Sequence, residues 1–96
     1  MKNERREEIP AEALAEFEEF VRFVSRDPAK NRARFYLLTW QPTLDGEMAL
    51  VCTWGRLGTQ GRSLAVVFPE RSCAQAKIAH LIRRRFQHGY QMMSWR

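Results

Sequence analysis

Residues 48–68 read MALVCTWGRLGTQGRSLAVVF, two apolar runs on either side of a glycine-rich turn. In the first run the apolar side chains alternate, so Leu50, Cys52 and Trp54 share one face of a predicted strand. Residues 62–68 form a second strand that is rich in aliphatic residues. Because glycine adopts the conformations that a tight turn requires, the stretch predicts an antiparallel β-hairpin.

Two further strands are expected upstream of this hairpin. Residues 34–40 (RFYLLTW) are dense in aromatic and aliphatic side chains and predict a strand with a buried face. Residues 20–26 (FVRFVSR) fit either a helical stripe or an alternating strand, and we favour the strand. The pairs Asp27-Pro28 and Asp45-Gly46 are turn signals between the strands. Together these segments predict an antiparallel meander.

Helices are expected at both ends of the meander. Residues 10–19 are rich in Ala, Leu and Glu, and Pro10 suits the first position of a helix. A longer helix is predicted from about Ser72 to His88, with Ser72 as its N-cap and Gly89 in the left-handed conformation that ends it. Its apolar residues form one stripe that should pack on the sheet: Ile78, Ala79, Leu81, Ile82 and Phe86.

The predicted fold is α+β: a small antiparallel β-sheet meander with a C-terminal helix packed across one face, plus a short N-terminal helix. A chain of 96 residues has a core for one domain only. We divide it into a charged tail with a short helix (1–19), one domain (20–91) and a C-terminal tail (92–96).

The formal charge of +5 is unevenly distributed along the chain. Residues 1–30 carry six Lys and Arg against eight acidic residues, whereas residues 31–96 carry ten against three. The basic excess of the second segment attracts polyanions, so nucleic acid is an expected partner. The N-terminus lacks the apolar segment of a signal peptide, and no apolar run is long enough to cross a bilayer. We therefore expect a cytoplasmic protein with no membrane partner.

The sequence contains no recognisable catalytic constellation. His80 and His88 match no zinc-binding spacing with Cys73, and neither Cys52 nor Cys73 has the neighbours of an activated thiolate. Two cysteines are too few for a disulfide framework, so we expect both to be small buried hydrophobic residues. The glycines of residues 55–61 lead into a strand, whereas a dinucleotide-binding motif leads into a helix. No enzyme activity, metal or cofactor is expected.

The tripeptide Trp54-Gly55-Arg56 has two interpretations. In the first, Trp54 stacks on a base or sugar, Gly55 lets another backbone approach, and Arg56 contacts a phosphate. In the second, Trp54 is a core residue, Gly55 belongs to a hairpin and Arg56 is a solvated cation. Local chemistry leaves both interpretations open.

Residues 54–58 (WGRLG) and the later Gly61 resemble the signature of the WGR domain family, which is named for its Trp-Gly-Arg. The order of the surrounding features is also similar: RFY in an aromatic strand, an acidic-Gly loop, and a long helix that ends at HGY. The segment SRDPAKNRARFYLLTWQPTL looks particularly like the stand-alone bacterial members. The resemblance covers about residues 20–91, most of the chain.

This resemblance implies a small antiparallel sheet with a helix packed across one face. In DNA-dependent poly(ADP-ribose) polymerases, WGR domains bind DNA at breaks, with the motif's tryptophan stacked at the terminal nucleotide and its arginine contacting neighbouring domains. By resemblance, Trp54 would stack on DNA, Arg56 would contact DNA or a protein partner, and Arg34 would contact a terminal phosphate. We expect no ADP-ribosyltransferase domain in this chain, so the polymerase activity is not implied.

We therefore expect a non-catalytic nucleic-acid-binding module that prefers duplex DNA, including its ends, in the context of DNA repair. Its candidate binding residues are Arg34, Trp54, Gly55, Arg56 and Arg62. Residues 83–85, three arginines, either add ionic contacts or form a solubilising helix end. The alternative is a protein-interaction module or accessory subunit that docks through the same Trp and Arg surface. The acidic N-terminal helix is expected to be an accessory or partner-binding element.

Overall fold

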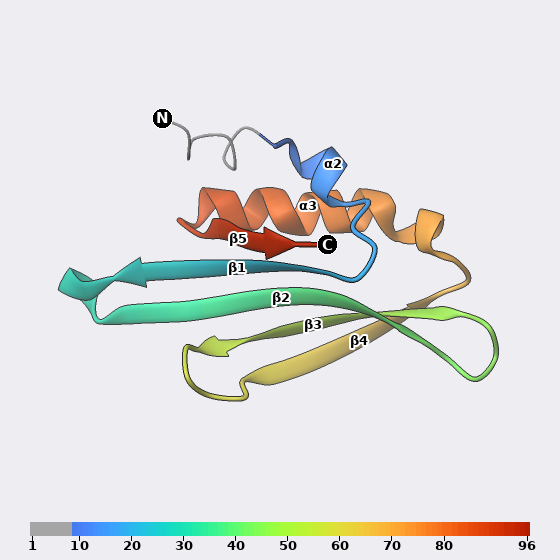
Figure 1. Cartoon of the computed structure of the whole chain (residues 1–96), viewed down its shortest axis with the longest axis horizontal. Helices are drawn as coiled ribbons and strands as arrows, with labels where there is room; N and C mark the ends of the chain where they lie inside the picture. The colour runs from blue at the N-terminus through green and yellow to red at the C-terminus, as the bar shows by residue number, and fades with distance from the viewer. Residues whose placement is uncertain (1–8) are drawn as a thin grey trace.

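The computed structural model describes residues 9–96, which form one curved sheet with two α-helices beside it (Figure 1). Along the chain the elements are α2 (Ala11–Leu14), β1 (Phe20–Asp27), η1 (Pro28–Lys30), β2 (Arg32–Pro42), β3 (Met48–Arg56), β4 (Arg62–Phe68), η2 (Arg71–Ala74), α3 (Gln75–Gln87) and β5 (Gln91–Trp95). The strand order is β4-β3-β2-β1-β5, and every neighbouring pair is antiparallel. The predicted α+β class and the meander of β1 to β4 are confirmed.

The predicted strands are present, and three of them are longer than expected. The strand expected at residues 62–68 coincides with β4, and the ambiguous residues 20–26 lie in β1. Strand β2 begins at Arg32, which pairs with Asp27 of β1, and β3 continues to Arg56, which pairs with Arg34 of β2. The Trp-Gly-Arg motif is therefore the end of β3, where Trp54 pairs with both β2 and β4 and the next two residues pair with β2.

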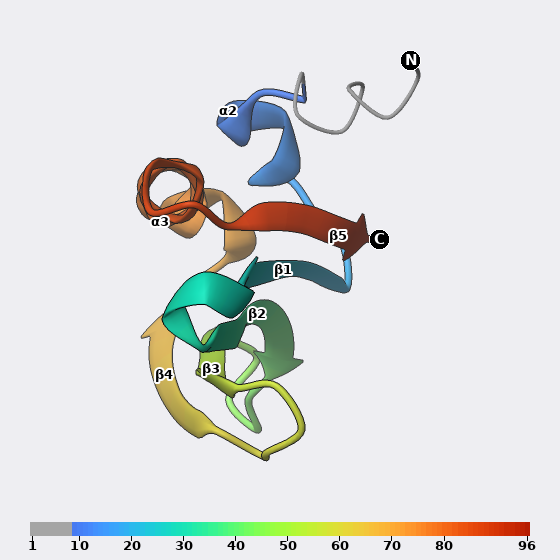
Figure 2. The same ribbon diagram turned by 90° about the vertical axis from the view of Figure 1, so that its left-hand side faces the viewer.

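The core lies between one face of the sheet and the helices. Alternation along the strands directs Phe23, Leu38 and Leu50 toward α3, whose Ile78 and Ile82 meet them there. The largest fully buried side chains are Phe17, Phe23, Leu14, Leu38, Leu50, Ile78, Ile82 and Val21. Figure 2 shows α3 end-on beside the curved sheet, with β4 bending round toward the helix side. The predicted packing of the α3 stripe on the sheet is confirmed.

The beginning of α3 differs from the prediction. Ser72 lies in the 3-10 turn η2, and α3 starts at Gln75 with Ala74 as its N-cap and no side-chain cap hydrogen bond. Ala74 already has helical backbone angles, so the chain enters α3 through a helical turn rather than from the extended conformation that suits a serine cap. The other end agrees with the prediction, because Gly89 has a φ of 86° just after the helix.

The N-terminal helix is shorter than predicted, and it belongs to the core. Helix α2 ends at Leu14, and the backbone N–H groups of Glu18, Glu19 and Phe20 then donate to the carbonyl oxygen of Arg96 at 2.6–3.2 Å. Phe17, in the connecting turn, stacks on Trp40 with ring centroids 5.7 Å apart. The residues expected to form the second half of the helix are therefore held by contacts with the rest of the domain and are not helical. The first eight residues of the expected N-terminal tail lie outside the described residues.

The expectation of a C-terminal tail at residues 92–96 is wrong, because Gln91–Trp95 form β5. This strand pairs with β1, with a register irregularity between Arg22 and Phe23. Only Met92 of its five residues is buried, so the strand has no alternating pattern that a sequence reading detects. Its pairing with β1 makes it a strand.

Candidate nucleic-acid interface

Three neighbouring strands bring the predicted binding residues to one end of the sheet. Arg34 of β2 lies opposite Arg56 of β3, and Trp54 of β3 lies between Tyr36 on one side and Arg62 of β4 on the other. Arg34, Arg56 and Arg62 are all exposed. The pairing therefore surrounds Trp54 with the cations that the sequence scatters over 29 residues, from position 34 to position 62.

Gly55 and Gly61 shape the turn beside Trp54. A Cβ atom added to Gly55 would lie 2.7 Å from the Cα of Gly61, so the two glycines lie back to back. Gly61 has a φ of 71°, and a Cβ there would collide with the carbonyl oxygen of Trp54 and lie 2.8 Å from the ring of Phe35. The backbone that approaches Gly55 is thus that of Gly61. Because neither residue has a side chain, the backbones at the two ends of the turn can pack directly against each other.

Arg56 fastens the turn η1 to the motif. Its guanidinium donates two hydrogen bonds of 3.2 Å to Asn31, one to the backbone carbonyl oxygen and one to the side-chain Oδ1. Asn31 has a φ of 53°, and Asn is one of the few residues that adopt this left-handed conformation readily. Because a guanidinium has five N–H donors, exposed Arg56 keeps donors for a further contact.

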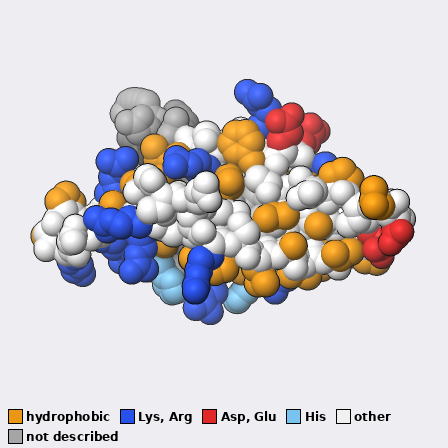
Figure 3. Space-filling view, turned by 90° about the horizontal axis from the view of Figure 1, so that it is seen from below, with side chains coloured by type: hydrophobic (Ala, Val, Ile, Leu, Met, Phe, Trp, Pro, Cys, Tyr) orange, Lys and Arg blue, Asp and Glu red, His pale blue; other side chains and the backbone are white. Residues whose placement is uncertain are grey.

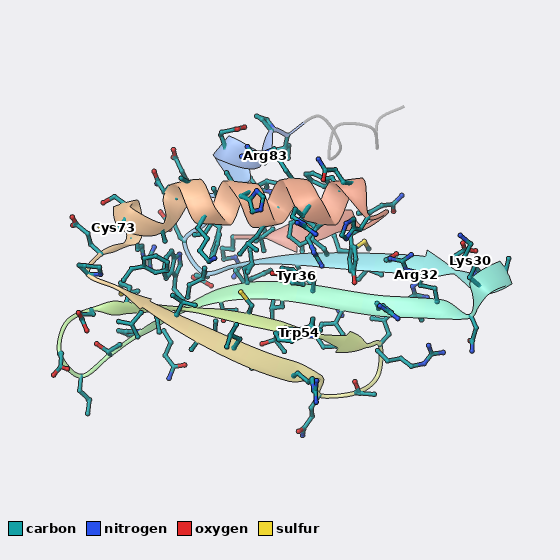
Figure 4. The ribbon with its side chains drawn as sticks, turned by 180° about the vertical axis from the view of Figure 1, so that it is seen from behind. Lys30, Arg32, Tyr36, Trp54, Cys73 and Arg83 are labelled. Carbon is teal, nitrogen blue, oxygen red and sulfur yellow. The ribbon has the colours of Figure 1, made fainter. Side chains whose placement is uncertain are left out.

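Trp54 combines features of both interpretations that the sequence leaves open. Its side chain is 36% exposed, although it points to the same side of the sheet as α3. One part of the ring borders a groove beside α3, and the rest faces solvent. In Figure 4, Tyr36 lies beneath α3, whereas Trp54 lies farther from the helix, beside β3. A ring in this position is held on one side and free for stacking on the other.

A cluster of two arginines and two tyrosines lies next to Trp54. The guanidinium of Arg85 is 4.4 Å from the ring centroid of Tyr36 and 5.2 Å from that of Tyr90. The guanidinium of Arg32 is 5.9 Å from the ring centroid of Tyr90 and donates a 3.0 Å hydrogen bond to the carbonyl oxygen of His88. Cation–π contacts therefore join the end of α3 to β2.

Sequence reasoning missed the role of this cluster. Arg85 follows Leu81 by four residues and so continues the stripe that faces the sheet, and this spacing was the available signal. Of the three consecutive arginines, Arg85 is packed on aromatic rings, while Arg83 pairs with Glu12 of α2, away from the motif (Figure 4). These two arginines therefore belong to different surfaces.

Two buried titratable groups on the same sheet face as Trp54, those of Tyr36 and Cys52, are neutral at ordinary pH. Burial raises the pKa of the Tyr36 phenol well above its usual value, and the neighbouring Cys52 raises it further. Burial also raises the pKa of the Cys52 thiol. Because the Tyr36 phenol and the Cys52 thiol stay protonated, neither adds a negative charge near the cations around Trp54. Cys52 is buried as expected, but the same expectation for Cys73 is wrong, because that residue is exposed within η2.

Charge is separated along the length of the molecule. Lys and Arg side chains gather over the half of the surface in Figure 3 that lies toward η1 and the β3–β4 turn, and hydrophobic side chains over the other half. The basic end carries Lys30, Arg32, Arg34, Arg56 and Arg62. The turn between β2 and β3, at the opposite end, carries the acidic residues Asp45 and Glu47. An anion is therefore attracted to the end that bears Trp54.

Metal ligands and membrane-spanning helices are two further features that would bear on function. Across residues 9–96, no group of three or more His, Cys, Asp or Glu side chains is arranged to hold a metal ion. None of the helices in this part of the chain has the length and apolarity needed to cross a bilayer.

Comparison with known proteins gives two matches. The model of the WGR domain family matches residues 19–94, which include all of β1 to β4 and α3. An uncharacterized protein, y4dW, of Sinorhizobium fredii (strain NBRC 101917 / NGR234) is 34% identical over 64 residues, which are 67% of this chain. The matched segment spans only 31% of that relative's length. No solved structure matches the chain significantly.

Proposed function

The chain belongs to the WGR domain family, and from this premise we propose that it binds duplex DNA, including its ends, through Trp54 and the surrounding arginines. WGR domains are known as non-catalytic, nucleic-acid-binding modules of poly(ADP-ribose) polymerase-like proteins. DNA as the preferred nucleic acid, a role in DNA repair and the binding residues are our proposals for this protein.

One observation carries the proposal: an exposed tryptophan with three exposed arginines on the same and the adjoining strands. Aromatic rings stack on any base, while arginines bind phosphates through charge-assisted hydrogen bonds. Arg34 and Arg62 lie on the strands that flank Trp54, so a nucleotide stacked on the ring has a cation on either side. This arrangement suits a terminal nucleotide and its phosphate.

The motif residues have separable roles in this proposal. Trp54 stacks, Arg34 contacts the terminal phosphate and Arg62 a neighbouring phosphate of the backbone. Gly55 acts through the shape of the hairpin, since its open face is filled by Gly61. Arg56 holds η1 in place through Asn31 and offers its remaining donors to DNA.

The test is fluorescence anisotropy with a short labelled duplex, either 5′-phosphorylated or not. We expect binding that prefers the phosphorylated end and that Trp54→Ala weakens by about 1–3 kcal/mol, the typical contribution of a stacked base. Arg34→Gln should remove the preference for the phosphate while leaving part of the affinity.

Trp95→Ala is the matched control, because Trp95 is also exposed, at 43%, but lies in β5, at the opposite edge of the sheet. This variant should bind like the wild type, and circular dichroism should show that all variants are folded. Equal losses in Trp54→Ala and Trp95→Ala, or no binding at low salt, would refute the proposal.

A second candidate function is docking on a protein partner through the same surface. The observation that favours it is the apolar groove that Trp54 borders, because Trp and Arg commonly anchor protein interfaces. In that case a partner chain would bind with no competition from nucleic acid, and the affinity would depend little on salt. The chain would then act as an accessory subunit or as one domain of a larger assembly.

A further inference from the structure

A groove of about 320 Å³ lies between α3 and the β4 side of the sheet. Its floor is mainly apolar, and Leu64 and Val66 form the part contributed by β4. The wall on α3 consists of Lys77, Leu81 and Arg85. The curvature of the sheet in Figure 2 brings β4 toward α3, but the helix leaves Leu64 58% exposed. The groove is therefore an apolar surface without a cover.

Strand β4 is also an edge of the sheet. Within the described residues it pairs only with β3, so one side of its backbone has no strand partner. Sheet edges are usually protected by charged residues, prolines or bulges. Strand β4 has a single charged residue, Arg62, at its first position, followed by SLAVVF. Its apolar stretch and free edge suit the addition of another strand.

The α3 side chains that line the groove are spaced so that alternate side chains of an extended chain can lie opposite them. Lys77, Leu81 and Arg85 are four residues apart, which places the two cations about 12 Å from each other along the helix. In an extended strand, residues i, i+2 and i+4 point to the same face, and the first and last are about 13 Å apart. Two acidic side chains at i and i+4 can therefore lie opposite the two cations, with an apolar side chain at i+2 opposite Leu81.

We propose that this groove binds an extended segment of a partner protein with the pattern acidic-x-apolar-x-acidic, which adds a strand to the edge of β4. Charge complementarity favours this occupant, because the residues that line the groove include two cations and no carboxylate. Main-chain hydrogen bonds to β4 supply affinity, and the alternate side chains that enter the groove supply specificity. Trp54 also borders this groove, but the inference rests on the edge of β4 and on the α3 side chains rather than on Arg34 and Arg62, so it stands whether or not the protein binds nucleic acid.

The experiment is an NMR titration of the full chain with the peptide Thr-Glu-Thr-Leu-Thr-Glu-Thr, capped at both ends. We expect shifts concentrated at the backbone amides of β4 and at the Lys77 to Arg85 stretch of α3. Leu64→Gln should weaken binding roughly tenfold by removing apolar contact, and Lys77→Gln by about threefold by removing one exposed ion pair. A peptide with both Glu replaced by Lys should not bind.

Val67→Gln is the matched control, because Val67 is 51% exposed on the opposite face of the same strand. It should bind the peptide like the wild type. A Lys77→Glu variant should in turn prefer a peptide with one Glu replaced by Lys. Equal binding of the Glu and Lys peptides, equal effects of Leu64→Gln and Val67→Gln, or no shift in β4 at millimolar peptide would overturn the inference. Leu64→Gln should leave duplex binding unchanged, so the two proposals can fail separately.

Discussion

Individual residues of the motif differ in whether they act on the fold or at the surface. Gly61 acts on the fold, because its positive φ and the closeness of Trp54 and Phe35 leave no room for a side chain. Trp54, by contrast, has an exposed ring that the hairpin positions. The Trp-Gly-Arg signature thus combines a surface side chain, that of Trp54, with a glycine, Gly55, that packs against the backbone of Gly61, six residues later.

Gly61→Ala should destabilise the protein by about 2–5 kcal/mol, because it adds left-handed strain to a collision with neighbouring atoms. Gly58→Ala is the control: Gly58 has a φ of 90°, but a Cβ atom added there would have no neighbour within 4 Å, so only the strain remains, about 1–2 kcal/mol. Urea unfolding of the two variants measures the difference. Equal losses of stability would show that the contacts at Gly61 are unimportant.

Tyr36 and Cys52 predict how stability depends on pH. Both pKa values are raised by burial, so the folded protein holds these two protons more tightly than the unfolded chain does. The free energy of unfolding should therefore be unaffected near neutrality and fall as the pH rises above about 9, the ordinary pKa of a thiol. Denaturant unfolding at pH 7 to 11 tests this, and Cys52→Ala should lessen the decline. A Cys73→Ala variant with the same effect would contradict the assignment, because Cys73 is exposed.

At the scale of elements, two short segments complete the domain. Helix α2 buries Leu14 against the core, and the turn after it buries Phe17. Strand β5 pairs with β1, and the Arg96 carbonyl that follows it accepts three hydrogen bonds, two from the turn after α2 and one from Phe20 at the start of β1. The N-terminal helix is therefore a structural element of the domain, and its interaction with Arg83 through Glu12 lies on the surface away from the motif.

Leu14→Ala should lower the free energy of unfolding by about 2–5 kcal/mol, as expected for a fully buried leucine. Glu16→Ala, an exposed change in the same segment, should alter it by no more than about 0.5 kcal/mol. Thermal or urea unfolding compares the two. If both variants were as stable as the wild type, α2 would not be docked on the domain in solution.

For the whole molecule, the separation of charge sets how nucleic acid is attracted. Cations gather at the end with the motif, and the acidic residues of the β2–β3 turn lie at the other end. Each phosphate that a cation neutralises contributes about 0.9 to the slope of the logarithm of affinity against the logarithm of salt concentration. The salt dependence therefore counts the contacts made by the basic end.

Arg34→Gln and Arg62→Gln should each reduce the magnitude of this slope by about one for duplex DNA. Arg71→Gln removes the same charge from η2, which precedes α3, whereas the Arg85 cluster next to Trp54 lies near the C-terminal end of that helix. This variant should leave the slope unchanged. Anisotropy titrations over a salt series give the three values. A uniform reduction in all three variants would mean that only the net charge matters and that no defined interface exists.

Much of the fold could be predicted because its signals are local. Alternation in residues 48–54 and 62–68 and the apolar stripe of residues 75–87 depend only on which side chains share a face. The start of α3 and the length of α2 could not be predicted in the same way. At these positions contacts with other elements outweigh the local capping and helix preferences.

The sequence alone thus determined the hairpin around Trp54, the order of the four-stranded meander and the family of the domain, since periodicity and turn glycines are properties of neighbouring residues. Tertiary structure decided the rest. It made residues 91–95 a strand by pairing them with β1, placed Arg85 on Tyr36 and Tyr90, and left the groove beside β4 uncovered. These features depend on strand register and on where α3 lies, and a pattern within one segment specifies its own buried face but not the element that will cover it.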